Sequence, residues 1–145
     1  MHSQSLVVVI FIIIAFAIVL LAAYAIMSVL ASKLISCKGI APYSCATPTL
    51  SQSGAVNATV DGFTEAETVL GIACTRTATA PETFTQTSKG VNPSAALLLS
   101  FDCKVPLNST GVSTYYLWIK DVRTGMSSPS VTNIAVVIIN ESSGK

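Results

Sequence analysis

The first 32 residues contain no Asp, Glu, Lys, Arg, Gly or Pro. Without charge this stretch cannot be a solvated surface helix, and without Gly or Pro nothing in it interrupts a helix. Residues 6–27 also carry no strongly polar side chain. As a helix they make a rod of roughly 33 Å at about 1.5 Å per residue. The chain therefore starts with a helix long enough to cross a membrane.

The chain also lacks the residues that most enzymatic and cofactor chemistry requires. His2 is the single histidine, and neither a GxxxxGK[ST] nor a GxGxxG motif is present. Nucleophilic catalysis by serine or cysteine needs a histidine beside the nucleophile, and no acid–base pair can be named. We therefore expect neither an enzyme nor a bound cofactor.

Charge and cysteine spacing argue against two further partners. The eight basic and seven acidic residues are scattered and give a net charge of +1. No basic patch forms, so we expect no nucleic-acid partner. The four cysteines do not form CxxC pairs, so we expect no metal site. Asp61, Glu65 and Glu67 lie close in sequence but do not match the EF-hand pattern, and we interpret them as a solvated turn and strand start.

Three interpretations of the apolar rod compete. A cleaved signal peptide needs a basic start and a shorter apolar run, and this segment has neither. A single-pass anchor fits the length of the apolar run. The first flanking charges, Lys33 and Lys38, however, lie on its C-terminal side, next to the part of the chain that contains the cysteines. The positive-inside tendency would place those lysines in the cytoplasm, where disulfides are rare. The third interpretation is a rod that leaves the membrane and packs against copies of itself, helped by small residues such as Ala17, Ser28 and Ser32.

A short polar N-terminus, a long apolar helix and a β-rich C-terminal head together resemble the archaeal type IV pilins and archaellins. The resemblance is one of architecture and covers Met1 to about Ser36. In that family a peptidase removes a basic leader, which is absent here, so we interpret the sequence as a mature chain beginning at Met1. Ser5 stands where many bacterial pilins carry a glutamate, which favours an archaeal type.

The resemblance implies an extracellular filament whose helices bundle in the core and whose heads form the outer wall. We expect a role in adhesion, with motility, DNA uptake and virus attachment as the alternatives. The subunit would lie in the membrane before assembly and form a homopolymer afterwards. The expected polymer-core residues are Leu6, Ile10, Ile13, Ile14, Ala17, Leu21, Tyr24 and Ser28. The main alternative is a single-pass, membrane-anchored surface protein with a ligand-binding β-sandwich head.

The pattern predicts an α+β fold with a hydrophobic helix over 1–36, a junction loop over 37–53 and a head over 54–145. Gly39 and Pro42 are suited to ending the helix. Apolar and alternating runs predict strands at 55–60, 68–79, 83–87, 95–105, 112–122 and 131–139. Turn signals separate them: Asp61-Gly62, Ala80-Pro81, Lys89-Gly90, Asn92-Pro93, Pro106 and Thr124-Gly125. Such spacing is typical of an antiparallel, immunoglobulin-like sandwich.

The even cysteine count in an exported chain predicts two disulfides among Cys37, Cys45, Cys74 and Cys103. A Cys37–Cys45 bridge would close a small loop and fix the angle between rod and head. A Cys74–Cys103 bridge could pin two neighbouring strands or two sheets.

Three sequons, at Asn57, Asn108 and Asn140, fit the acceptor pattern for N-glycosylation, whereas Pro93 excludes Asn92. All three lie at or near predicted turns or strand ends, where a glycan can be accommodated. We therefore expect the exported surface to be glycosylated.

Overall fold

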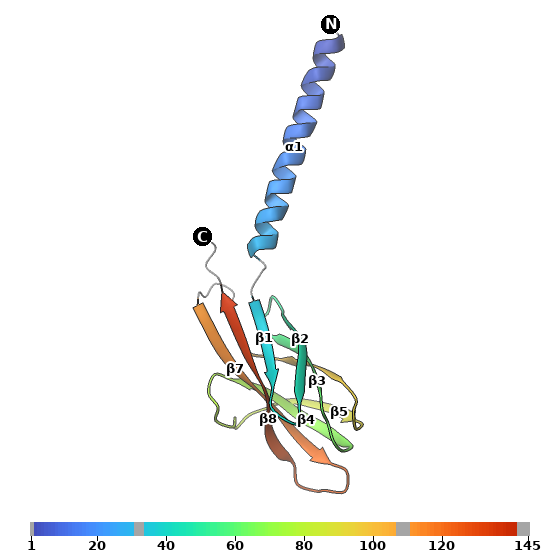
Figure 1. The fold of residues 1–145 in the computed structure, drawn as a ribbon, viewed down its shortest axis with the longest axis vertical. Coiled ribbons are helices and arrows are strands. Elements are labelled where there is room, and N and C mark those ends of the chain that lie inside the picture. Colours follow the sequence, from blue (N-terminus) through green and yellow to red (C-terminus); the bar gives the residue numbers. More distant parts are fainter. Residues whose placement is uncertain (1, 31–33, 107–110, 142–145) are drawn as a thin grey trace. The chain divides into compact units, whose positions relative to one another are not determined.

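The computed structural model describes residues 2–30, 34–106 and 111–141, which form one helix and a set of antiparallel strands (Figure 1). The chain divides into two compact units, and the second, Leu34–Ser142, holds all the described strands. We call this second unit the head domain. The predicted α+β class, with a long apolar helix followed by antiparallel β-structure, is confirmed.

Helix α1 spans His2–Leu30 and ends earlier than predicted. The expected continuation to residue 36 is wrong, because strand β1 covers Leu34–Gly39 and pairs along its whole length with β8. The predicted junction loop over 37–53 is also wrong, since it contains part of β1 and all of β2 (Ser44–Leu50). Side chains alternate between exposed and half-buried along β1. Pairing in a sheet therefore satisfies the backbone hydrogen bonds of β1 and leaves one face to be partly buried.

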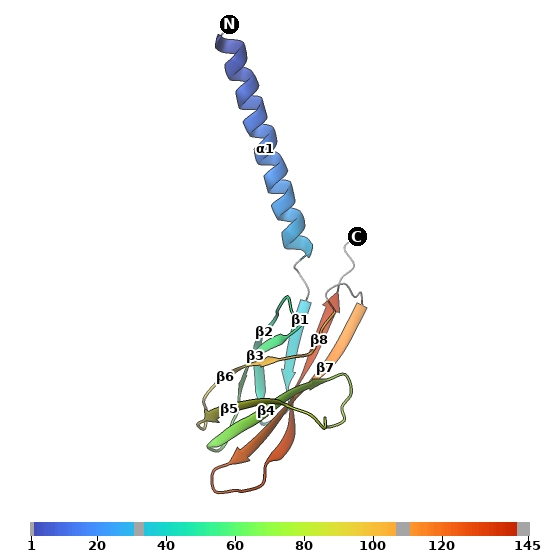
Figure 2. The ribbon, with the colours of Figure 1, turned by 180° about the vertical axis from the view of Figure 1, so that it is seen from behind.

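The head domain consists of two antiparallel sheets (Figures 1 and 2). The five-stranded sheet has the order β1-β8-β7-β4-β5, and the three-stranded sheet has the order β2-β3-β6. The remaining strand bounds are β3 Val56–Asp61, β4 Glu67–Thr75, β5 Thr85–Val91, β6 Leu97–Phe101, β7 Gly111–Arg123 and β8 Ser130–Glu141. Two antiparallel sheets agree with the predicted head, while the immunoglobulin-like layout stays a prediction.

The six predicted strands correspond to β3 through β8. The two longest, β7 and β8, form a hairpin around Thr124-Gly125, where Gly125 has a φ of 87° (Figure 1, orange and red). Only glycine adopts such a φ without strain, so this predicted turn is confirmed. The turn predicted at Lys89-Gly90 is wrong, because both residues pair with β4 inside β5.

One hydrophobic core lies between the two sheets. The three-stranded sheet contributes residues such as Val56, Leu99 and Phe101, and the five-stranded sheet contributes residues such as Tyr115 and Leu117. All of these side chains are at least 98% buried. Removal of this apolar surface from water is the main force that holds the sheets together.

Both predicted disulfides are present, and each joins one sheet to the other. Cys37 of β1 is bonded to Cys45 of β2, and Cys74 of β4 is bonded to Cys103, which follows β6. Strands β1, β2 and β6 are all edge strands. The expectation that Cys37–Cys45 fixes the angle between rod and head is wrong, because both cysteines lie within the head domain.

Candidate functional site

The largest candidate surface is helix α1 itself. Every described side chain from Ser3 to Tyr24 is exposed, and apolar side chains point outward on all sides of the helix. A soluble domain rarely exposes a contiguous apolar patch of more than a few hundred Å². Helix α1 therefore needs a surrounding apolar phase, which a lipid bilayer or other helices of the same kind can supply.

Most of the predicted polymer-core residues lie on this exposed surface. The exposed fractions of the six larger ones range from 47% for Ile10 to 77% for Tyr24. The set with described side chains comprises Leu6, Ile10, Ile13, Ile14, Ala17, Leu21 and Tyr24. The side chain of Ser28 lies outside the described part of the helix. These residues are available for contact with neighbouring helices, and the contact itself stays a prediction.

The helix also meets the requirements of a membrane span. Residues His2–Tyr24 form a 23-residue segment that contains an 18-residue window with a mean hydropathy of 3.5. At about 1.5 Å per residue this segment matches the roughly 30 Å hydrocarbon core of a bilayer. Hydropathy alone does not separate an anchor from the other interpretations of this segment, so the function depends on what the helix does after insertion.

Two of the three predicted glycosylation sites lie in the described part of the head domain. Asn140 is exposed near the end of β8. Asn57 is half-buried in β3, the central strand of the three-stranded sheet, with Thr49 and Ser100 directly opposite it. Asn108 lies outside the described residues. Asn140 is therefore the more accessible of the two acceptors, and glycan attachment stays a prediction.

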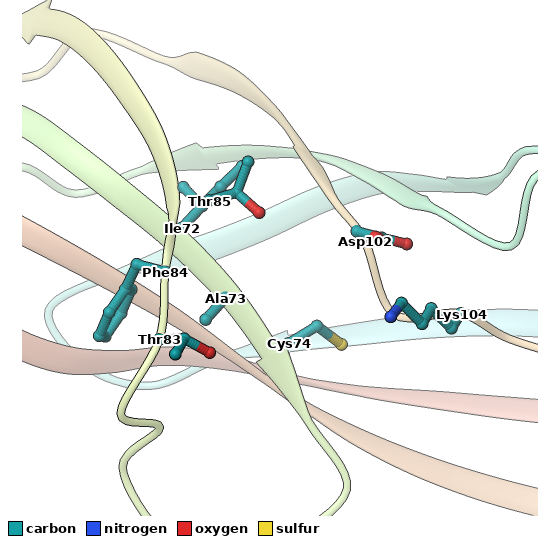
Figure 3. Close-up of a pocket in the computed structure, with 8 residues that line it drawn as sticks. All are labelled: Ile72, Ala73, Cys74, Thr83, Phe84, Thr85, Asp102 and Lys104. Atoms are coloured by element: carbon teal, nitrogen blue, oxygen red, sulfur yellow. The ribbon is translucent and has the colours of Figure 1, made fainter.

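A pocket of about 250 Å³ opens on the head domain beside the Cys74–Cys103 disulfide (Figure 3). Residues 72–74 of β4, residues 83–85 and the two charged side chains Asp102 and Lys104 line it. The Phe84 ring points away from Asp102 and Lys104. Ligand pockets usually measure about 300–1,000 Å³ and are mostly apolar. This pocket is small, and Cys74, its one sulfur-bearing residue, is held in a disulfide.

A buried pair of carboxyl groups is the feature that the sequence analysis missed. Glu67, expected in a solvated strand start, is only 6% exposed, and Asp121 of β7 is 2% exposed. On the paired strands β4 and β7, Val69 lies opposite Asp121 and Glu67 lies opposite Arg123. Glu67 and Asp121 are thus diagonal neighbours on one face, where side chains of this length can meet.

The environment of this pair favours the protonated form of Glu67. Burial, the negative charge of Asp121 and a side-chain hydrogen bond with Asp121 raise the pKa of Glu67 from 4.5 to about 7, while Arg123 acts in the opposite direction. Burial also raises the pKa of the nearby Tyr43 phenol, and the charges of Glu67 and Asp121 raise it further. Among the described residues, no group of three or more His, Cys, Asp or Glu side chains could hold a metal.

Comparison of the chain with protein-family models, curated proteins and solved structures finds no match.

Proposed function

We propose that this chain is the structural subunit of an extracellular, archaeal type IV pilus-like filament used for adhesion. In this proposal the α1 helices bundle in the filament core and the head domains form the outer wall. The supporting observation is that α1 is apolar and exposed on every side over residues 6–24. Each face of a helix in the middle of a bundle meets another helix, so it has no need of a polar face.

The energetics of such a bundle differ from those of a soluble core. A helix that leaves lipid for neighbouring helices exchanges one apolar surrounding for another, so little water is expelled. Stability then depends on packing density and on close approach at small residues such as Ala15, Ala17, Ala22 and Ala23. The role is structural rather than catalytic.

The head domain supports a location outside the cytoplasm. Two disulfides cross-link a domain of about 110 residues, from Leu34 to Ser142. Small domains with such bridges are typical of oxidising compartments. A head in that compartment, attached to a membrane-length helix, is the arrangement that a surface filament subunit requires before assembly.

The alternative function is a single-pass anchor that carries a binding head. The length of the His2–Tyr24 segment favours it, and the pocket beside Cys74 would then be the first place to look for a ligand. In that case each helix stays in lipid as a single span. The two functions therefore differ in whether the intact chain leaves the membrane without detergent.

The experiment that separates them is mechanical shearing of cells that make the chain, followed by sedimentation and negative-stain microscopy. A filament subunit is expected in the sheared, detergent-free pellet as long fibres that contain the intact helix. An anchored protein stays with the membrane fraction until detergent is added and then runs as a monomer. Fibre-free sheared material from cells rich in the protein would contradict the filament proposal.

A further inference from the structure

The Glu67–Asp121 pair is buried in the head domain, at 6% and 2% exposure. Ser130 donates a hydrogen bond to Oδ1 of Asp121 at 3.2 Å. Oε1 of Glu67 is buried without a hydrogen-bond partner. Two carboxyl groups can hydrogen-bond to each other only when one of them carries a proton, because an ionised carboxylate is an acceptor and never a donor.

The surrounding charged and titratable groups do not replace this proton. Arg123, beside Glu67 on β7, is half-exposed, and its guanidinium lies 4.0 Å from the exposed Glu65 carboxylate. Tyr43, between β1 and β2, has a phenol whose pKa is raised by burial and also by the nearby charges of Glu67 and Asp121, and a phenol supplies no positive charge. The buried residues that the structure describes include no cation, so a second buried negative charge would stay uncompensated.

We propose that Glu67 holds a proton in the folded head domain, in a hydrogen bond with Asp121, and that this proton makes the head a pH-sensitive element that is more stable at about pH 5 than at about pH 8. The proposal concerns the head domain alone, so it holds whether the chain polymerises or remains an anchor.

The sign of the effect follows from proton linkage. The folded head holds the proton more tightly than the unfolded chain, in which both carboxyl groups are solvated. The stabilisation is therefore complete below the ordinary pKa of a glutamate and is lost as the pH rises to neutrality. Its window is about pH 4.5 to 7, set by the ordinary and raised pKa values of Glu67. Carboxylates that are salt-bridged in the folded state shift stability in the opposite direction.

The test uses the full-length, oxidised chain in detergent micelles. Trp118 is the single tryptophan, and it lies in β7 at 7% exposure, so its fluorescence reports unfolding of the head by guanidinium. Between pH 5 and 8 the unfolding equilibrium constant of the wild type should rise by roughly 70-fold from this one proton. Glu67→Gln, which mimics the protonated acid, should change by less than about threefold over that range. Glu82→Gln, the same change at an exposed acid, should keep the wild-type dependence.

A second measurement does not depend on any variant. Unfolding of the wild type at pH 6 in weak buffer should release about one proton per chain, because the unfolded glutamate is ionised at that pH. Absence of that proton, or equal pH dependence in wild type and Glu67→Gln, would overturn the proposal. Restoration of wild-type stability at pH 8 by added calcium, but not in Glu67→Gln, would also overturn it, since the pair would then hold a cation.

Discussion

Cys74 and Cys103 have Cα atoms 5.0 Å apart, and their disulfide ties the five-stranded sheet to the chain that leaves the three-stranded sheet. Cys37–Cys45 makes a second tie between the sheets but closes a much shorter loop, with a sequence separation of 8 rather than 29. The two bonds therefore restrict the unfolded chain by different amounts.

Removal of each disulfide as a pair of Ala substitutions should show that difference. The chain-entropy model predicts a loss of about 3.6 kcal/mol for Cys74–Cys103 and about 2.5 kcal/mol for Cys37–Cys45. Guanidinium unfolding followed by Trp118 fluorescence measures both. A larger loss for the Cys37–Cys45 pair would mean that native-state packing, rather than loop entropy, determines the effect.

Leu99 and Leu98 are neighbours on β6 with opposite surroundings, at 1% and 62% exposure. Leu99→Ala should lower the free energy of unfolding by about 2–5 kcal/mol, because it leaves a cavity in the shared core. Leu98→Ala is the matched control and should stay within about 0.5 kcal/mol of the wild type. Equal losses at the two positions would contradict the assignment of the inner face of the three-stranded sheet.

Gly62, directly after β3, has a φ of 93°, and a Cβ there would collide with the backbone oxygen of Pro42. Gly62→Ala should therefore destabilise the head domain by more than about 1 kcal/mol. Gly90 in β5 has open space around its Cα. Gly90→Ala should be neutral or stabilising by up to about 1 kcal/mol, because it reduces the freedom of the unfolded chain. Thermal unfolding of both variants checks the contrast.

Ile13→Asp tests the role of α1. It places an unpaired carboxylate among apolar helices, so filament yield in the sheared fraction should fall by roughly tenfold or more. The remaining apolar residues of the segment favour membrane insertion despite a cost of about 2.5–3.5 kcal/mol for one central Asp. The variant should therefore still be found in the membrane fraction. The control is Met126→Asp, in the connection between β7 and β8, where the replaced side chain is about as exposed as that of Ile13. This variant should assemble normally. Normal filaments from Ile13→Asp would rule out the helix bundle.

Glycan attachment is tested by the intact mass of protein from its native source. Asn140→Gln should remove the mass of one glycan, because Asn140 is exposed, and it should remove more occupancy than Asn57→Gln, whose site is half-buried in a central strand. Asn92→Gln should change nothing beyond the substitution itself, since Pro93 blocks that sequon. A native mass equal to the bare polypeptide would end the glycosylation hypothesis.

Hydrophobicity and its period were enough to predict the class of the fold. An apolar segment without charge, Gly or Pro predicts a helix, and alternating runs separated by turn residues predict strands. Both patterns are local, and α1 and strands β3 through β8 form where the patterns predict them. The Leu34–Leu50 region was different. Gly39 and Pro42 indicate a break, but they do not tell whether a helix or a strand precedes it. Pairing with the distant strand β8, in the register Leu34↔Asn140 to Gly39↔Ala135, decided in favour of a strand.

The sequence alone determined that the chain joins an apolar rod to a cysteine-bridged β-rich domain, because length, hydropathy and residue spacing are properties of neighbouring residues. Only the tertiary structure decided that both disulfides cross between the sheets and that Glu67 is buried beside Asp121. Both results depend on which distant strands become neighbours. Asp121 reaches Glu67 through the pairing of β4 with β7, and no local pattern around Glu67 distinguishes it from the exposed Glu65 two residues earlier.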